Sequence, residues 1–353
     1  MFRASFALLL VFIAGVSLSS CDSGPQRVVL SGGTMGTTWS VIYAAADSSQ
    51  VTDFDPVSPA DLQLLIEREL EAINQSLSTY IPDSEISRVN AIATAAPVIL
   101  SERFATVLDA ALTVGELTEG AYDVTVGPLV ELWGFGAGAR TTSPPEASEI
   151  RAAMDLVGAD RLSWDPRTST LSRPKGVRID LSSIAKGYAV DQLSQVLAAH
   201  GIVSSLVEIG GELRASGERP EGGPWRLAVE SPDPSQARFI EALSVTDAAV
   251  ATSGDYRNFF EHEGRRYSHL VDPRTGHPVA HELVSVTVID PHCMTADALA
   301  TALLVMGLDA ARDLAEKQGL AAHFVARGEE ALELHYTPAF EAYRQNAKAG
   351  AKP

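Results

Sequence analysis

The 353-residue sequence predicts an α+β fold rather than a doubly wound parallel sheet, because strand-like and helical segments are mixed without strict alternation. The length allows one large or two ordinary domains. Apolar residues make up 46% of the chain and charged residues 20%, which is ordinary for a soluble globular protein. The net charge of −18 argues against nucleic acid as a partner, because phosphate backbones require clustered Lys and Arg.

The first 20 residues predict a signal peptide that is not part of the fold. Arg3 supplies a positive charge, and the apolar run from Phe6 to Val16 is too short to span a membrane. The run ends in Leu18-Ser-Ser-Cys21, which resembles a bacterial lipoprotein processing site. We therefore expect Cys21 to become the lipidated, palmitate-bearing first residue. The alternative is an ordinary secretory signal that happens to contain a cysteine.

Residues 21–27 predict a short tether between this lipid anchor and the folded domain, because the segment contains Gly and Pro. Asp22 resembles an inner-membrane retention signal, so we expect the protein on the periplasmic face of the inner membrane. Cys293 is the other cysteine of the chain. If Cys21 is lipidated, no intramolecular disulfide can form, and stability must come from core packing.

The first half of the chain predicts a strand pair followed by two amphipathic helices. Loose alternation over 28–44, around a glycine cluster, indicates two strands joined by a turn. Ser58-Pro-Ala-Asp61 is a typical helix start, with a Ser cap, Pro in the first turn and an acidic residue. This helix and a second one over 101–117 carry apolar residues at helical spacing, namely Leu62, Ile66, Leu70, Ile73, Leu77, Phe104, Leu108, Ala111 and Val114.

The second half predicts further helices around a group of strands. A helix that begins near Lys186 ends at His200-Gly201, a plausible glycine cap. Strand patterns cover 203–209, 225–230, 239–245 and 284–289, and a helical pair over 295–306 and 309–318 ends in Gly307 and Gly319. Residues 341–353 are polar and Ala-rich, and we expect a disordered tail there.

The segment 180–188 (Asp-Leu-Ser-Ser-Ile-Ala-Lys-Gly-Tyr) is the most informative stretch of the chain. It follows a strand-like run over 177–180 and leads into a helix. Such a junction offers free backbone amides, hydroxyl groups and the positive charge of Lys186, which together suit a phosphate group. The alternative is a helix N-terminus capped by Ser182 or Ser183. The segment alone favours neither.

A second candidate site is formed by Asp297 and Thr301. They lie four residues apart on a mostly apolar helix, so the carboxylate and the hydroxyl share one face. An ionised Asp in apolar surroundings must be paired, solvated or coordinating. The oxygen pair suits Mg²⁺. The alternative is that Asp297 acts near a helix start while Thr301 bonds back to a carbonyl.

Aromatic and histidine residues form the remaining candidates. Tyr80 follows a helix, and the glycine-bounded segment 120–128 leads to Trp133-Gly-Phe-Gly136. Aromatic rings near polar turns can stack on a planar ligand, although such rings more often close a core. His269 beside apolar residues is usually structural. Near a phosphate and a metal it would be a candidate general base, since its pKa lies close to neutral.

In their order along the chain, these segments resemble the ApbE-type FAD:protein FMN transferases, a family of bacterial periplasmic lipoproteins. The matching stretches are 35–39, 77–80 with Ser84, Ser87 and Asn90, 120–135, 180–191, 208–214, 251–260, 268–276 and 294–301. The resemblance implies one ApbE-like (T-fold-like) unit over 28–340, with mixed sheets, packed helices and FAD in a central cleft. It also implies Mg²⁺-dependent cleavage of FAD at its pyrophosphate, with transfer of FMN to a Thr or Ser hydroxyl and release of AMP.

The resemblance also implies the site residues. The metal ligands are the backbone carbonyl of Ala185 and the side chains of Asp297 and Thr301. The FAD contacts fall on Met35, Tyr80, Ala121, Tyr122, Asp123, Ser182, Asp191 and Val271. We add Lys186 to these contacts because of its positive charge. We also expect His269 to be the general base, with Asp255 as the second candidate.

Three functions remain open from the sequence. The first is the transferase, whose implied acceptors are proteins of membrane flavin-dependent redox complexes. The second is a hydrolase of the same fold that converts FAD to FMN and AMP. The third is a flavin-binding lipoprotein without catalysis, which the intact pair of Asp297 and Thr301 disfavours.

Overall fold

The computed structural model describes residues 27–44, 57–138, 141–233, 239–256 and 258–350. The expected signal peptide, Cys21 and all but the last residue of the expected tether lie outside the described residues. Among the helices that are described, none is both long and apolar enough to cross a bilayer.

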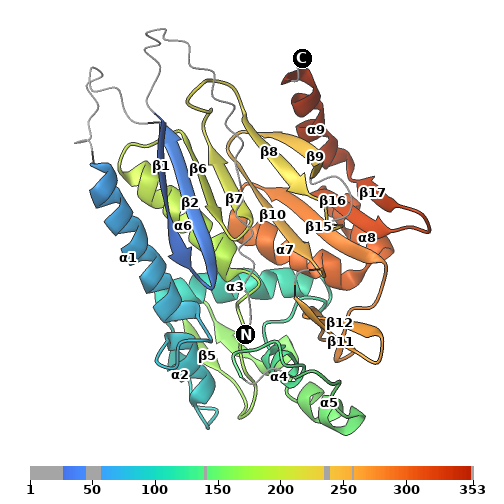
Figure 1. The fold of residues 1–353 in the computed structure, drawn as a ribbon. Helices are drawn as coiled ribbons and strands as arrows, with labels where there is room; N and C mark the ends of the chain where they lie inside the picture. The colour runs from blue at the N-terminus through green and yellow to red at the C-terminus, as the bar shows by residue number, and fades with distance from the viewer. Residues whose placement is uncertain (1–26, 45–56, 139–140, 234–238, 257, 351–353) are drawn as a thin grey trace, which may run out of the picture.

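An eight-stranded sheet forms the centre of the molecule (Figure 1). Its strand order is β1-β2-β6-β7-β10-β15-β16-β17, and each described pairing is antiparallel. The strands are β1 (Arg27–Thr34), β2 (Thr37–Ala44), β6 (Ser205–Ile209), β7 (Glu212–Ser216), β10 (Ala248–Gly254), β15 (Leu283–Asp290), β16 (Ala321–Arg327) and β17 (Leu332–Tyr336). The central strands are apolar on both faces, so both faces of the sheet must be covered.

Helices cover one face of the sheet, and a strand pair with a helix covers the other. Ala249 and Ala251 of β10 belong to the main core, whereas Ala248 and Val250 belong to a second core on the opposite face. The main core includes residues of α1 (Pro59–Leu77), α3 (Glu102–Leu117), α6 (Ala185–Ala199), α7 (Cys293–Met306) and α8 (Leu308–Gln318). The second core includes β8 (Trp225–Glu230), β9 (Phe239–Val245) and α9 (Pro338–Gly350).

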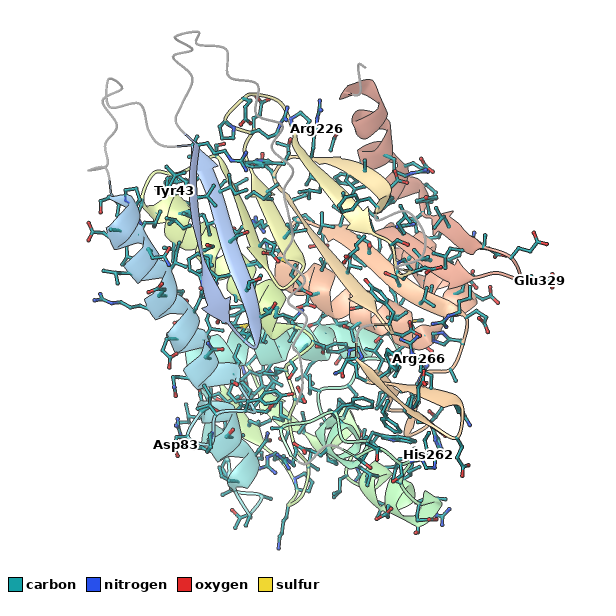
Figure 2. All side chains as sticks on the ribbon, in the orientation of Figure 1. Tyr43, Asp83, Arg226, His262, Arg266 and Glu329 are labelled. Carbon is teal, nitrogen blue, oxygen red and sulfur yellow. The ribbon has the colours of Figure 1, made fainter. Side chains whose placement is uncertain are left out.

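Short elements form the lower part of the molecule in Figure 1. They are α2 (Glu85–Ala91), α4 (Gly127–Leu132), α5 (Ala147–Met154), the 3-10 turn η1 (Ala159–Arg161), and the strands β3 (Val98–Ile99), β4 (Ser163–Asp165), β5 (Thr170–Ser172), β11 (Phe259–His262), β12 (Arg265–Ser268), β13 (Val271–Asp272) and β14 (His277–Pro278). Figure 2 shows His262 and Arg266 on the β11–β12 hairpin, which hangs below the sheet. The turn between β1 and β2 points towards the same region.

Most of the helices and strands expected from the sequence are present. The amide of Asp61 donates to Ser58 Oγ at 3.1 Å, which confirms the predicted cap of α1. Ser101 caps α3 in the same way, through the amide of Phe104. Gly307 and Gly319 end α7 and α8 with positive φ angles of 79° and 67°, which glycine adopts without strain.

Two expectations are wrong. Residues 177–180 form no regular strand; the Asn90 side chain exchanges two hydrogen bonds with the backbone of Ile179, and the amide of Asp180 donates to Val124 O at 2.7 Å. The chain is also helical over 338–350, where we expected a disordered tail from 341. Phe340 is fully buried, and Arg344 bonds Glu241 at 2.6 Å, which anchors α9 despite its polar composition.

We expect His323 to make the protein less stable in acid. This ring is fully buried on β16, stacks on Tyr336 with centroids 4.6 Å apart, and has no hydrogen bond at either nitrogen among the described residues. Burial lowers the pKa of His323 to about 3, with Arg344 contributing in the same direction. Between about pH 6.5 and pH 3 the unfolded chain therefore binds a proton that the folded chain does not. As the pH is lowered through this range, the free energy of unfolding should decrease by up to about 1.4 kcal/mol per pH unit.

The measurement is urea unfolding from pH 7 to pH 4, repeated on His323→Phe, which should lose this part of the slope. His292→Asn is the matched control, because its side chain is 69% exposed. An unchanged slope in His323→Phe would contradict the assignment.

Candidate active site

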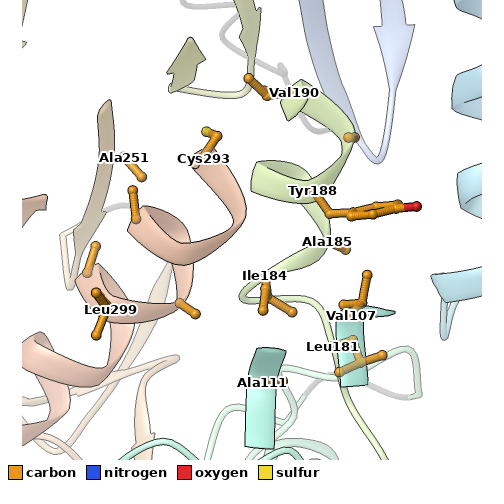
Figure 3. Close-up of a cluster of buried hydrophobic side chains, with 14 of the residues drawn as sticks. Val107, Ala111, Leu181, Ile184, Ala185, Tyr188, Val190, Ala251, Cys293 and Leu299 are labelled. Atoms are coloured by element: carbon orange, nitrogen blue, oxygen red, sulfur yellow. The ribbon is translucent and has the colours of Figure 1, made fainter. Parts of the chain in front are cut away.

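The buried helices α6 and α7 approach each other closely at Gly187. Figure 3 shows Ala185, Tyr188 and Val190 of α6 and Cys293 of α7 in the core around this approach. A Cβ atom at this position would lie 2.3 Å from the carbonyl oxygen of Cys293 and 2.8 Å from Asp297 Cβ, so only glycine fits. The amide of Gly187, in the first turn of α6, donates to Asp297 Oδ2 at 3.0 Å. Because Gly187 has no side chain, the two helices lie close enough for the Asp297 carboxylate of α7 to reach the N-terminus of α6.

Asp297 lies in surroundings that disfavour a negative charge. It is only 4% exposed, and burial raises its pKa to about 7, although the positive charge of Lys186 acts in the opposite direction. One turn further along α7, Thr301 Oγ1 lies 3.0 Å from the hydroxyl of Ser253 on β10. This contact replaces the bond from Thr301 to a carbonyl that we considered as the alternative.

The oxygens of Asp297, Thr301 and Ser253 fit a hard divalent cation such as Mg²⁺. No ion pair is found for Asp297 among the described residues, and its Oδ2 accepts a single backbone amide. The described part of the chain contains no group of three His, Cys, Asp or Glu side chains that could hold a metal. A cation here would therefore depend on one carboxylate, hydroxyl groups and a backbone carbonyl such as that of Ala185, together with oxygens of a substrate.

Lys186 is close to Asp297 but is paired with another acid. Its Nζ lies 2.5 Å from Oε1 of the buried Glu212 on β7. Burial lowers the pKa of Lys186, but the charges of Glu212 and Asp297 outweigh this and the net pKa is raised. Glu208, on the neighbouring β6, accepts the amide of Gly211 at 2.8 Å, and burial raises its pKa. Lys186 is thus surrounded by three carboxyl groups.

The segment before α6 leaves the helix N-terminus uncapped by a side chain. Ser183 Oγ donates to the phenolic oxygen of Tyr122 at 3.0 Å, and the amide of Ser182 donates to Asp180 Oδ1 at 2.8 Å. Neither serine is the cap that we considered as the alternative. Burial raises the pKa of Tyr122, and Asp297 and Asp180 act in the same direction, so its hydroxyl stays protonated near neutral pH.

Two of the predicted FAD contacts have carboxylates that already hold the fold together. Asp123 accepts hydrogen bonds from the amide and hydroxyl of Thr125 and from the amide of Ala159. Asp191 accepts the amides of Cys293 and Met294 and the guanidinium of Arg214, at 2.8 to 3.0 Å. Asp191 therefore caps α7, six residues (about 9 Å) along α6 from Ala185.

The other predicted contacts lie on several different elements. Met35 occupies the β1–β2 turn with a positive φ of 49°, and Tyr80 is 65% exposed just after α1. Ala121 and Val271 are buried, Ala121 directly before Tyr122. A cavity of about 650 Å³ lies between α1, α3 and α6, but none of the predicted site residues lines it.

His269, which follows β12, has the geometry of a neutral base. Its Nδ1 lies 3.1 Å from the carbonyl oxygen of Asn258, and its backbone amide donates to the same oxygen at 3.0 Å. A carbonyl only accepts, so Nδ1 carries the proton and Nε2 carries the lone pair. Burial lowers the pKa of His269, and Lys186 is near enough to lower it further, while Asp255 acts in the opposite direction.

Asp255, the second candidate base, is held by two arginines. Its carboxylate accepts Arg327 Nη2 at 3.0 and 3.3 Å, and its backbone carbonyl accepts Arg266 Nη2 at 2.9 Å. Asp255 is 7% exposed. These contacts favour a structural role over proton transfer.

Known proteins are similar to this chain in sequence and in fold. A family model described as the ApbE family matches residues 35–324. The chain belongs to the ApbE family. It is 41% identical over 330 residues to the FAD:protein FMN transferase of Vibrio cholerae (92% of this chain, 95% of that one), and 39% identical over 331 residues to that of Haemophilus influenzae (92% and 94%).

Solved structures of ApbE-family proteins match the fold. The flavin transferase ApbE from Vibrio cholerae superposes with a TM-score of 0.83 at 40% identity, covering 90% of this chain and 99% of that one. The apo form of the Pseudomonas stutzeri flavinyl transferase ApbE gives a TM-score of 0.82 at 38% identity, covering 94% and 99%. The predicted α+β unit is therefore confirmed.

Sequence reasoning missed Gly187 and Glu212 as parts of this site, and it singled out Ser253 only within the segment 253–257, without its contact to Thr301. Gly187 lies inside the singled-out segment 180–188, and the other two lie within matching stretches, but their partners are 26 to 110 residues away. Glycine has a low helix propensity, so its presence within a predicted helix at position 187 was the one signal in the sequence for a close contact there.

Gly187→Ala should separate α6 from α7 and impair the site, because the new methyl group would overlap a carbonyl oxygen. We expect a loss of about 1–3 kcal/mol in the free energy of unfolding and a larger relative loss of activity. Chemical unfolding and a flavin-transfer assay measure the two effects. Gln195→Ala, an exposed position on the same helix, is the control and should change stability by less than about 0.5 kcal/mol. Full stability and activity in Gly187→Ala would contradict this account of the crossing.

Proposed function

We propose that this ApbE-family enzyme transfers FMN from FAD to a Thr or Ser hydroxyl of an acceptor protein and releases AMP. The chain is a transferase, as its relatives are, and their names state FAD as the donor and a protein as the acceptor. The observation that carries the finer proposal is the buried oxygen pair of Asp297 and Thr301 near Lys186, whose positive charge also acts on the neutral His269. We infer an oxygen site for a cation from the first three residues and a base from His269.

In the proposed reaction one phosphorus–oxygen bond replaces another. The acceptor hydroxyl oxygen bonds to the FMN-side phosphorus of FAD, and the bond from that phosphorus to the bridging oxygen breaks. AMP leaves with the bridging oxygen, and the hydroxyl proton passes to His269 Nε2. Phosphoryl transfer depends mainly on positioning and charge neutralisation, so a modest base contribution is sufficient.

The residues fit Mg²⁺ held by the side chains of Asp297 and Thr301 and the carbonyl of Ala185. When bound, the ion would neutralise charge on the pyrophosphate. Ser253 orients the Thr301 hydroxyl. The ammonium group of Lys186 has three N–H donors and uses one of them in the hydrogen bond to Glu212. The remaining donors could bind a phosphate oxygen.

The flavin contacts remain proposals. We assign Met35, Tyr80, Ala121, Tyr122, Asp123, Ser182, Asp191 and Val271 to FAD on the basis of the family resemblance. The exposed Tyr80 has a ring surface that suits stacking on a flavin or adenine. The carboxylates of Asp123 and Asp191 already accept hydrogen bonds from other residues. These two residues would therefore contact FAD through their backbone, or they would act indirectly by holding neighbouring segments in place.

The acceptor and the location are also proposals. A lipid anchor at Cys21 would hold the enzyme at the periplasmic face of the inner membrane. There it would meet acceptor proteins of membrane flavin-dependent redox complexes.

Substitutions in the oxygen pair test the cation site. Asp297→Asn should lower Mg²⁺-dependent transfer by at least about 100-fold, because an amide cannot supply the negative charge. Thr301→Val should also lower transfer, whereas Thr301→Ser keeps the hydroxyl and should retain most of it. The assay follows flavin attached to an acceptor as Mg²⁺ is varied. Wild-type activity of Asp297→Asn at low Mg²⁺ would rule out this cation site.

His269→Ala tests the base and should lower transfer by about 10²–10⁴-fold while FAD still binds. Asp255→Asn is the comparison, and a large loss there with nearly normal transfer in His269→Ala would move the base role to Asp255. Mass spectrometry of the acceptor after incubation with FAD and Mg²⁺ also separates the two enzymatic alternatives. Free FMN with no labelled acceptor would identify the hydrolase.

A further inference from the structure

Five rings make continuous contact between the segment after α4 and His269. In order of contact they are Trp133, Tyr267, Phe260, Phe135 and His269, and we call them the aromatic ladder. Successive centroids are 5.6, 5.1, 5.7 and 6.3 Å apart. The first three contacts are stacked, and the last is edge-on at 71°. These distances are typical of favourable aromatic pairs.

The ladder joins two segments that carry site residues. Phe135 and Trp133 follow Tyr122 and Asp123 on one segment, while Phe260 and Tyr267 face each other across the β11–β12 hairpin. His269 is the first residue after β12. The ladder thus connects the segment of the proposed flavin contacts to the segment of the proposed base.

The end of α4 places Phe135 accurately. Gly134 adopts a positive φ of 76°, its amide donates to Glu131 O at 3.0 Å, and the amide of Phe135 donates to Val130 O at 2.9 Å. This is the Schellman arrangement of a helix C-terminus. The indole nitrogen of Trp133 donates to Gly276 O at 2.9 Å, which fixes the other end of the ladder.

His269 needs a second restraint besides its hydrogen bond. The bond from Nδ1 to Asn258 O fixes one atom of the ring, but the ring could still tilt about that bond. The edge contact with Phe135 limits this tilt and shields one side of the imidazole from water. Asp255 and Lys186 are the charged groups that act on the ring, and Arg266 holds Asp255 by its carbonyl.

We propose that Phe135 is a positioning residue for His269, whose ring it holds in place so that Nε2 faces the acceptor hydroxyl. The inference rests on the proposed role of His269 as base. Phe135 touches neither FAD nor the acceptor in this account and acts only through the imidazole.

The experiment compares Phe135→Leu with Phe135→Tyr in the flavin-transfer assay over a range of pH. Phe135→Leu keeps an apolar side chain but loses the ring, and we expect kcat to fall about 10- to 100-fold while KM for FAD changes by less than about threefold. Hydration of the imidazole should move the acid limb of the pH profile up towards the ordinary histidine value of about 6.5. Phe135→Tyr keeps the ring, and kcat and the acid limb should stay close to wild type.

Tyr267→Leu is the matched control for general destabilisation. The ring of this residue stacks on Phe260 and Trp133, and among the described residues the ring packed against His269 is that of Phe135, so the loss of Tyr267 should lower the melting temperature without moving the acid limb. A Phe135→Leu variant with wild-type kcat and an unmoved acid limb would overturn the inference. So would a limb that moves equally in Tyr267→Leu.

A double variant separates this inference from the proposed function. In a His269→Ala background, Phe135→Leu should cause less than about a twofold further loss, because the ring that it positions is gone. Full additivity of the two losses would overturn the positioning role while leaving His269 as the base. Wild-type transfer by His269→Ala alone would instead overturn the proposed base, and the positioning role with it.

Discussion

The contact between α6 and α7 at Gly187 is the constraint on which the rest of the site depends. Each helix supplies an acidic residue to the N-terminus of the other: Asp297 of α7 accepts the amide of Gly187, and Asp191 of α6 accepts the amides of Cys293 and Met294. A negative charge at a helix N-terminus is favourable because it meets unsatisfied amides and the positive end of the helix dipole. This exchange fixes the two helices in register, and it holds a carboxylate in the core that packing alone would exclude.

The cost of burying Asp297 explains the surrounding charges. An isolated buried carboxylate tends to take up a proton, and the raised pKa of Asp297 reflects this tendency. Lys186 opposes it only in part, because its nearest partner is Glu212. With Glu208 also near, acidic groups outnumber the one lysine. The cluster therefore favours an added positive charge, which is the electrostatic condition that the proposed cation needs.

Local sequence patterns predict the frame of this site but not its contacts. The caps of α1 and α3 and the i, i+4 pair of Asp297 and Thr301 depend on neighbours in sequence, so they were predictable. The partners of Thr301 and Lys186 lie on strands far away in the chain, and no periodicity encodes them. The run 177–180 has the composition of a strand, but Asn90 supplies the hydrogen bonds that a neighbouring strand would provide.

The proposed cation site and the proposed base belong to different parts of the molecule, so the proposed reaction would require a rigid connection between them. Ser253 lies on β10 of the main sheet and its partner Thr301 on α7, which packs against that sheet, whereas His269 follows the hairpin below it. Asp255 is two residues from Ser253, and its carbonyl is bound by Arg266, three residues before His269. Its carboxylate is bound by Arg327 of β16, so one residue ties the end of β10 to the sheet and to the hairpin. This arrangement explains why an acid so close to the site is better suited to holding the two halves together than to accepting a proton.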